Sequence, residues 1–117
     1  MLKNVRTQII SLACIIAASS LQPVFAQTTG GAGTIKMVAS GWSSDTFGIA
    51  TTAPVVNPAG CAVTDQYQTT SANAGYSTNY AAALTAYSTG SQVQVVVSNT
   101  TCTNTRPTLV GLYVTPP

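Results

Sequence analysis

The chain begins with a segment that has the three parts of a secretory signal peptide. Lys3 and Arg6 supply a positive start, an apolar stretch follows, and a small-residue cleavage site ends at Ala26. Residues 1–26 are therefore predicted to be removed, and residues 27–117 to fold in the periplasm or outside a bacterial cell. A chain of this length makes one small domain with a modest core, so a covalent cross-link is expected to support it.

Very few charged side chains remain after the leader. Lys36 and Arg106 balance Asp45 and Asp65, and residues 27–117 contain neither histidine nor glutamate. A net charge of zero gives no electrostatic basis for binding nucleic acid or an anionic membrane, and no second long apolar run predicts a membrane span. Because so few groups can transfer protons, the chain is not expected to be an enzyme, and neither a cofactor nor a metal site is expected.

The cysteines predict one disulfide. Cys14 lies in the leader and is lost with it, so Cys61 and Cys102 are the remaining pair. In an oxidising compartment they are expected to bond to each other, and closing this loop contributes about 4 kcal/mol in the chain-entropy description. A bridge between two molecules is the alternative.

Alternating and β-branched segments predict five strands separated by loops rich in glycine, proline and hydroxyl side chains. The predicted strands cover residues 34–40, 47–52, 61–68, 92–98 and 108–114. Residues 27–33 are rich in glycine and threonine and are predicted to form a flexible N-terminal arm. Residues 34–117 are predicted to form a single disulfide-linked domain.

The apolar period changes to that of a helix over residues 77–88. Tyr80, Ala83, Leu84 and Tyr87 share one helical face, on which both tyrosines are expected to reach the core. The predicted N-cap is Ser77 or Thr78, and the predicted C-terminal glycine is Gly90.

The opposite helical face carries Asn79, Ala82 and Ala86, a stripe of small residues. Two interpretations of this stripe remain open: close packing between protomers, or an exposed face filled with good helix formers.

Five strands with one helix between the third and the fourth is the order of an OB-fold, a five-stranded β-barrel whose loops and strand faces bind oligosaccharides or oligonucleotides. The predicted fold class is therefore mainly β, an OB-like barrel with one short helix and one disulfide.

The segment of residues 80–95, YAAALTAYSTGSQVQV, resembles the helix-turn-strand segment of pentameric toxin B subunits of the subtilase-cytotoxin and pertussis-like types. In both, an aromatic-rich helix ends in a Thr-Gly turn and leads into a strand. The resemblance implies an OB-fold, a ring of five protomers and recognition of surface glycans. The N-terminal half and the disulfide of this chain do not match those subunits, so no glycan-binding residue is carried over.

One predicted ligand site surrounds the only tryptophan. Trp42 can stack on the apolar side of a sugar ring, while Ser43, Ser44 and Asp45 can exchange hydrogen bonds with its hydroxyl groups. The alternative is that Trp42 closes one end of the core and that Asp45 caps a turn.

Two further residues are candidate ligand contacts. Tyr76 lies in a Gly-Tyr-Ser turn just before the predicted helix. Arg106 can bind a sugar carboxylate through its planar guanidinium group, or else can pair with an aspartate at the surface.

Together these features predict an exported, non-catalytic binding protein for a glycan, with oligomers of toxin B-subunit type. The competing hypothesis is a periplasmic or surface accessory protein that binds another exported protein. Low charge and an uncovered sheet edge favour it equally.

Overall fold

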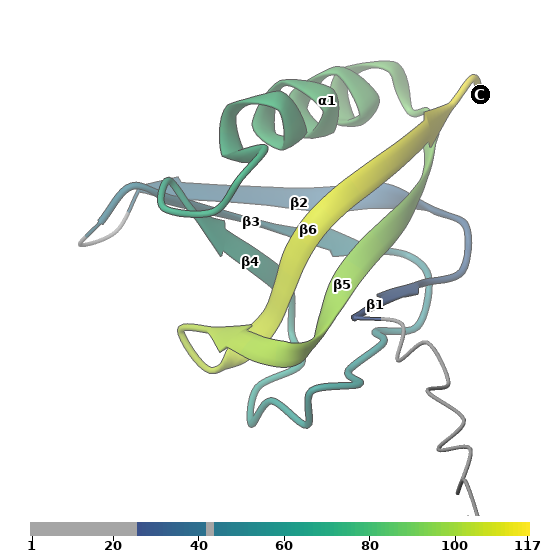
Figure 1. The fold of residues 1–117 in the computed structure, drawn as a ribbon. Helices are drawn as coiled ribbons and strands as arrows, with labels where there is room; N and C mark the ends of the chain where they lie inside the picture. The colour runs from purple at the N-terminus through teal and green to yellow at the C-terminus, as the bar shows by residue number, and fades with distance from the viewer. Residues whose placement is uncertain (1–25, 42–43) are drawn as a thin grey trace, which may run out of the picture.

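The computed structural model describes residues 26–41 and 44–117 (Figure 1), so all of the predicted signal peptide except Ala26 lies outside the described residues. The described part is mainly β, with six strands and one helix. They are β1 (Gln27–Thr29), β2 (Gly33–Gly41), β3 (Thr46–Thr51), β4 (Tyr67–Thr70), α1 (Tyr76–Thr89), β5 (Gln92–Thr103) and β6 (Arg106–Thr115).

The six strands form one sheet in the order β1-β5-β2-β3-β4-β6, and β5 also pairs with β6. All pairs are antiparallel except β4–β6. Two of the pairings are short: β2 meets β5 through two residue pairs, and β4 meets β6 only at Gln68 and Thr108. The sheet is not a closed barrel, so the prediction of a barrel is corrected at these two seams, where too few residues pair to close it.

Residues 27–29 fall in the segment predicted as a flexible arm, and they form β1 on the edge of β5. Thr28 pairs with Val97, and the Asn99 N–H donates to the Ala26 carbonyl at 3.0 Å. Because this strand precedes the others, α1 follows the fourth strand. The predicted position of the helix between the third and fourth strands is therefore wrong.

The third predicted strand starts too early. The Asn57 side chain accepts a hydrogen bond from the Cys61 N–H at 2.8 Å and donates one to the Cys61 carbonyl at 2.9 Å. The Val63 N–H donates to the Thr105 carbonyl at 3.0 Å, and Gly60 has a φ of +68°. These side-chain and loop bonds use the backbone groups that a strand would need, so the strand begins only at Tyr67.

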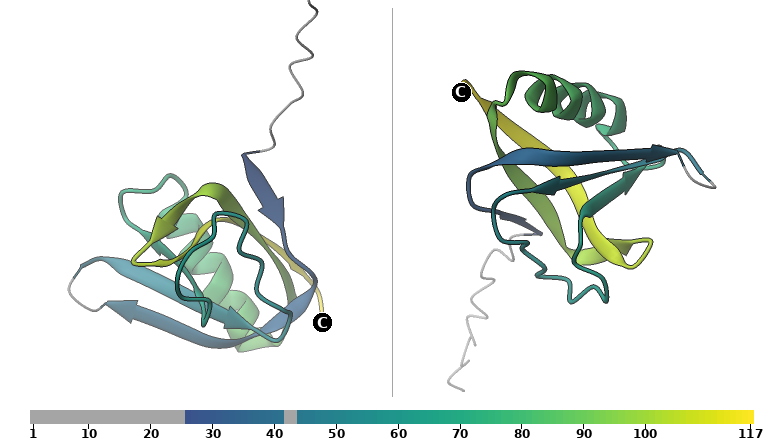
Figure 2. Two further views of the ribbon diagram at one scale, coloured as in Figure 1. Left: turned by 90° about the horizontal axis from the view of Figure 1, so that it is seen from below. Right: turned by 180° about the vertical axis from the view of Figure 1, so that it is seen from behind.

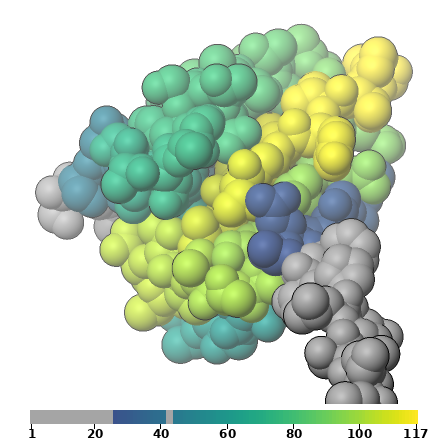
Figure 3. Space-filling model, viewed as in Figure 1, coloured from purple at the N-terminus to yellow at the C-terminus, as the bar shows by residue number. Residues whose placement is uncertain are grey.

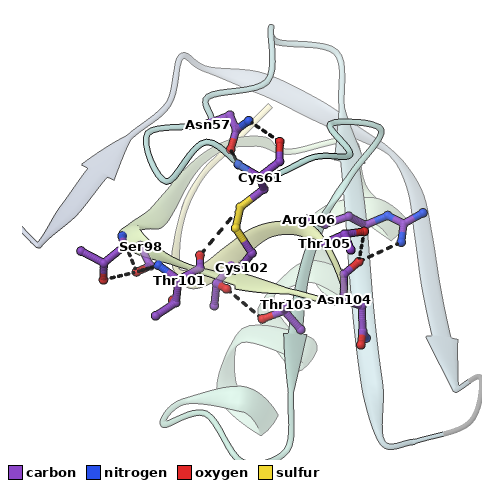
Figure 4. Close-up of a disulfide and its surroundings, with 11 residues drawn as sticks. Asn57, Cys61, Ser98, Thr101, Cys102, Thr103, Asn104, Thr105 and Arg106 are labelled. Atoms are coloured by element: carbon purple, nitrogen blue, oxygen red, sulfur yellow. Dashed lines mark hydrogen bonds between the residues drawn. A yellow bond between two sulfur atoms is a disulfide. The ribbon is translucent and has the colours of Figure 1, made fainter.

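The hairpin of β5 and β6 is longer than predicted, and the disulfide attaches to it. Cys61 and Cys102 are bonded with their Cα atoms 5.7 Å apart, as predicted (Figure 4). The register of β5 against β6 shifts between Val97 and Cys102, where the Ser98 hydroxyl accepts hydrogen bonds from the N–H groups of the two threonines that follow Asn99. The bulge lets the strand continue to the disulfide where a loop was predicted.

Two residues at the tip of this hairpin have left-handed backbone conformations. Asn104 has a φ of 47° and Thr105 a φ of 68°. Two-residue hairpin turns of type I′ require positive φ at both central positions, which suits asparagine but strains a β-branched threonine.

Thr105→Gly is therefore expected to raise the free energy of unfolding by about 1 kcal/mol, because glycine adopts this conformation without the left-handed cost. Urea unfolding of the variant and the unmodified protein measures the difference. A lower stability for the glycine variant would mean that contacts of the Thr105 side chain outweigh the backbone strain.

The core lies between α1 and the strands, and it contains side chains from every strand except β1. Its buried members are Ile35, Phe47, Ile49, Tyr67, Ala83, Ala86, Val93, Val95, Val97 and Leu109. The predicted inward positions on the Val-rich strand are confirmed, because its three alternate valines are all buried. Figure 2 shows α1 at one end of the strands and the loop of residues 52–66 at the opposite end.

The face that the helix turns to the core is only partly the predicted one, since Ala83 is buried and Tyr80 packs against the core as predicted, but Leu84 and Tyr87 do not. Its buried residues are Asn79, Ala83 and Ala86, whereas Leu84 is 39% and Tyr87 51% exposed. Small residues let α1 pack closely over β2 and β6, and the Asn79 side-chain N–H donates to the Val110 carbonyl at 3.4 Å. Two members of the small-residue stripe, Asn79 and Ala86, therefore pack within the protomer while Ala82 is half-buried, which neither interpretation anticipated. The prediction of Tyr87 as a core residue is wrong.

The two ends of α1 differ in how well they were predicted. Gly90 ends the helix in the left-handed conformation, as predicted. The start differs: the N-cap is Gly75, with a φ of 77°, and no side chain caps it. Tyr76 thereby becomes the first helical residue.

Candidate functional site

Three of the predicted ligand residues lie where the β2–β3 hairpin meets the start of α1. Ser44 and Asp45 are exposed and immediately precede β3, and the Tyr76 hydroxyl donates a hydrogen bond to Asp45 Oδ1 at 2.7 Å. Trp42 and Ser43 lie outside the described residues. The structure thus joins Asp45 and Tyr76, which are 31 positions apart in the sequence.

Hydrogen bonds on both sides of Asp45 fix the backbone that carries its carboxylate. Thr46 is buried, its hydroxyl donates to the Gly41 carbonyl at 2.8 Å, and its N–H donates to the Ser44 carbonyl at 2.9 Å. The Ser71 N–H donates to the Asp45 carbonyl at 3.0 Å. Asp45 is therefore held both from its own hairpin and from the loop after β4.

An aromatic cluster supports the Tyr76 ring. The ring centroid of Tyr76 is 5.3 Å from that of Phe47 in an edge arrangement, and the Tyr80 centroid is 5.0 Å from that of Phe47. Tyr76 and Tyr80 lie parallel to each other at 6.4 Å. Such pairs add stability beyond their buried area and hold the phenol in one orientation. A firmly placed aromatic ring beside a carboxylate is suited to binding a sugar.

The contact with Asp45 changes the acidity of Tyr76. The hydrogen bond to the carboxylate, together with desolvation and the negative charge of Asp45, raises the pKa of Tyr76 from 10.0 to about 12. The phenol therefore stays protonated and remains a hydrogen-bond donor to Asp45 at every physiological pH.

This shift gives a testable pH dependence. Because the pKa is higher in the folded state, the stabilisation is fully present below about pH 10 and is lost as the pH rises through about 12. In a spectrophotometric titration, Asp45→Asn should return the Tyr76 transition toward the ordinary range. Burial also raises the pKa of Tyr67, so Tyr76→Phe is needed to identify the Tyr76 transition by its disappearance. Superimposable titrations of Asp45→Asn and the unmodified protein would contradict the assignment.

Arg106 is not part of this arrangement. Its Nε donates to Asp65 Oδ1 at 2.6 Å and its Nη2 to Asp65 Oδ2 at 3.0 Å, while Nη1 donates to the Asn104 carbonyl at 3.3 Å. The guanidinium lowers the pKa of Asp65, and the carboxylate raises the pKa of Arg106. Pairing of Arg106 with an aspartate was the alternative that the sequence left open. The ion pair occupies the edge of the guanidinium group that would otherwise bind a sugar carboxylate.

This ion pair ties the loop of residues 52–66 to the β5–β6 hairpin, beside the disulfide. The Asp65 side chain is 54% exposed and that of Arg106 19%, so the pair contributes little to stability in water. Figure 4 shows Arg106 and the turn residues Asn104 and Thr105 on the hairpin that carries Cys102.

Sequence reasoning did not anticipate that Phe47 and Tyr80 support Tyr76. The available signal was the helical spacing of Tyr76 and Tyr80, which places them one turn apart on the same face. It was missed because the helix was predicted to start after Tyr76.

Residues 26–41 and 44–117 contain no group of three or more metal-binding side chains. Within the same residues no helix is long and apolar enough to cross a membrane. Comparison of the chain with protein-family models, with curated proteins and with solved structures finds no match.

Proposed function

We propose that this chain is an exported, non-catalytic binding protein and that its ligand is an uncharged glycan. The observation that carries the proposal is the Asp45–Tyr76 pair, an exposed carboxylate bonded to an aromatic side chain that is fixed by two neighbouring rings. A carboxylate accepts hydrogen bonds from sugar hydroxyls, and an aromatic side chain provides apolar contact area.

The charges favour a neutral ligand over an acidic one. The candidate site carries the negative charge of Asp45, which repels a sugar carboxylate. Arg106, the cation considered for sialic acid, is already bonded to both carboxylate oxygens of Asp65. Binding a sialylated glycan there would require breaking this pair.

Export follows from the leader in the sequence and agrees with the disulfide, since such bonds persist in oxidising compartments. Cleavage after Ala26 would release a chain that begins at β1. Secretion or periplasmic residence then places the protein where surface glycans are accessible.

The toxin B-subunit resemblance remains part of the proposal. Its support is that β2 to β6 pair in a cycle, from β2 through β3, β4, β6 and β5 back to β2, as a partly open five-stranded barrel of OB type would. A ring of five protomers is the assembly that this resemblance implies.

The direct test is a glycan array probed with the oxidised mature protein and three variants. Tyr76→Phe and Asp45→Asn should each weaken binding to neutral oligosaccharides about tenfold, the value of one hydrogen bond to a charged group. Asp65→Asn is the matched control, because it removes a carboxylate away from the site and should leave binding unchanged. Absence of binding to every glycan would contradict the proposed function.

A second function, binding of another exported protein, is favoured by a different observation. Several large apolar side chains are at least 39% exposed, namely Met37, Leu84, Tyr87, Tyr113 and Val114. Exposed apolar surface of this kind marks contact with other proteins when it forms a patch. Light scattering during size exclusion separates the cases: a five-fold multiple of the protomer mass supports the B-subunit resemblance, and a monomer without glycan binding favours an accessory protein.

A further inference from the structure

The first residue after the predicted cleavage site is Gln27, and its place at the start of β1 has a chemical consequence. An N-terminal glutamine carries an α-amine and a side-chain amide that can meet in a five-membered ring. Whether they can meet in a folded protein depends on what holds the amine and the side chain.

The pairing of β1 with β5 leaves the Gln27 nitrogen outside the sheet. In an antiparallel pair, residues alternate between exchanging both backbone hydrogen bonds and exchanging none. The Asn99 N–H donates to the Ala26 carbonyl at 3.0 Å, and the Gly30 N–H donates to the Val95 carbonyl at 2.8 Å. Positions 26, 28 and 30 therefore face β5 with their backbone groups, and the Gln27 N–H and C=O point away from it.

The rest of β1 keeps the new terminus in place. Thr28 pairs with Val97, its hydroxyl donates to Asn99 Oδ1 at 2.6 Å, and Gly30 is buried. Gln27 itself is exposed. Figure 3 shows the atoms of the β1 segment at the surface of the molecule. The amine is thus anchored close to the sheet by its neighbours without being bonded to the sheet itself.

We propose that Gln27 is a modification site, at which the mature chain cyclises to an N-terminal pyroglutamate. The neutral α-amine attacks the side-chain Cδ, a C–N bond forms, the bond from Cδ to the amide nitrogen breaks, and that nitrogen leaves as ammonia with the proton released by the amine. No oxidant, reductant or further reactant is needed. An α-amine with a pKa of about 8 is partly neutral at physiological pH, so the nucleophile is available.

The modification removes the one positive charge that leader cleavage creates. It also converts the free amine, which aminopeptidases require, into a ring amide. Since the Gln27 N–H makes no bond to β5, ring formation leaves the pairing of Thr28 with Val97 intact. The result is an uncharged, blocked end on an edge strand.

The inference rests on the cleavage proposed after Ala26, and intact-mass spectrometry tests both steps. The full chain is expressed in a secreting bacterial host, purified in its oxidised form and incubated at neutral pH. The expected product begins at Gln27 and becomes lighter by one molecule of ammonia, with the loss confined to the N-terminal peptide. Gln27→Asn is the matched control, because its shorter side chain would have to form a strained four-membered ring and should keep its amine.

A synthetic peptide with the first residues of the mature chain gives the reference rate. If the fold leaves the amine free, protein and peptide should cyclise at rates within a few-fold of each other. A chain that begins at Gln27 and retains its amine while the peptide cyclises would overturn the inference. A chain that begins elsewhere would overturn it together with the cleavage site, and neither result would affect the glycan-array test.

Discussion

Gly48→Ala is expected to destabilise the protein by about 3 kcal/mol, the upper range for forcing an extra methyl group into a packed interior. Gly48 lies in β3, paired with Ala39 of β2 and Gln68 of β4. A Cβ at this position would lie 2.5 Å from Gln66 Oε1 and 2.9 Å from the Tyr67 carbonyl oxygen. Both distances are shorter than real contacts allow, and the second involves backbone that cannot rotate away.

Gln66 has little room to give way, because it is only 3% exposed. Its Oε1 is buried and accepts no hydrogen bond from the described residues. Moving the amide would disturb β4, which begins at the next residue. Glycine is thus needed at position 48 because a larger side chain would occupy space that the Gln66 side chain fills.

Urea unfolding followed by circular dichroism measures the loss. Gly31→Ala is the matched control, since no atom lies within 4 Å of its added Cβ, and it should change the free energy of unfolding by less than about 0.5 kcal/mol. Adding Gln66→Ala to Gly48→Ala should recover part of the loss by removing the shorter contact. Equal stabilities for the two alanine variants would show that β3 and β4 separate easily.

Short-range patterns in the sequence predicted the elements whose backbone bonds are local or regular. Helix α1 ends at Gly90 as predicted, and the valine alternation of β5 correctly places Val93, Val95 and Val97 in the core. These features depend on residues only a few positions apart, which is the range that periodicity reports.

The errors come from bonds between distant segments. Nothing in the local pattern of residues 27–33 indicates that β5 has a free edge for β1. Cys61 falls outside β4 because Asn57 and the β5–β6 hairpin bind the backbone of its loop. The helix face was mispredicted because Leu84 and Tyr87 are more hydrophobic than the residues that are buried. Close packing of α1 on β2 and β6 has room only for small side chains.

The candidate site, too, was predicted only in part: its residues were identified from the sequence, but their pairing was not. Composition identified Asp45, Tyr76 and Arg106, since charged and aromatic side chains are scarce in this chain. Which of them lie together was not predictable, because Asp45 and Tyr76 meet through the tertiary fold whereas Arg106 bonds to Asp65. With only two aspartates in the sequence, Asp65 was one of two possible partners.

Replacing both cysteines by alanine, Cys61→Ala with Cys102→Ala, is expected to lower the free energy of unfolding by about 4 kcal/mol. The bond spans 41 positions and joins the loop of residues 52–66 to the β5–β6 hairpin. Without it the unfolded chain gains the conformational freedom of that loop. The folded state keeps the Val63–Thr105 hydrogen bond and the Asp65–Arg106 pair between the same two segments.

The ion pair provides a comparison at the same place in the fold. Asp65→Asn breaks a non-covalent link between the segments that the disulfide joins, but in an exposed position, so its cost should stay below about 1 kcal/mol. Guanidinium unfolding of the oxidised protein, the reduced protein and both variants measures the difference. The reduced protein and the double alanine variant should agree, since each lacks the cross-link.

The size of the loss in the free energy of unfolding shows whether the disulfide acts mainly by restricting the unfolded chain. A loss near 4 kcal/mol with a larger dependence on denaturant means that the bond mainly restricts the unfolded chain. A loss no larger than that of Asp65→Asn would contradict this account. It would mean that contacts such as the Tyr67 hydroxyl with the Val56 N–H, at 2.9 Å, already order the loop before the chain folds. The unfolded chain would then already be restricted in this region, so the covalent cross-link would remove little further conformational freedom from it.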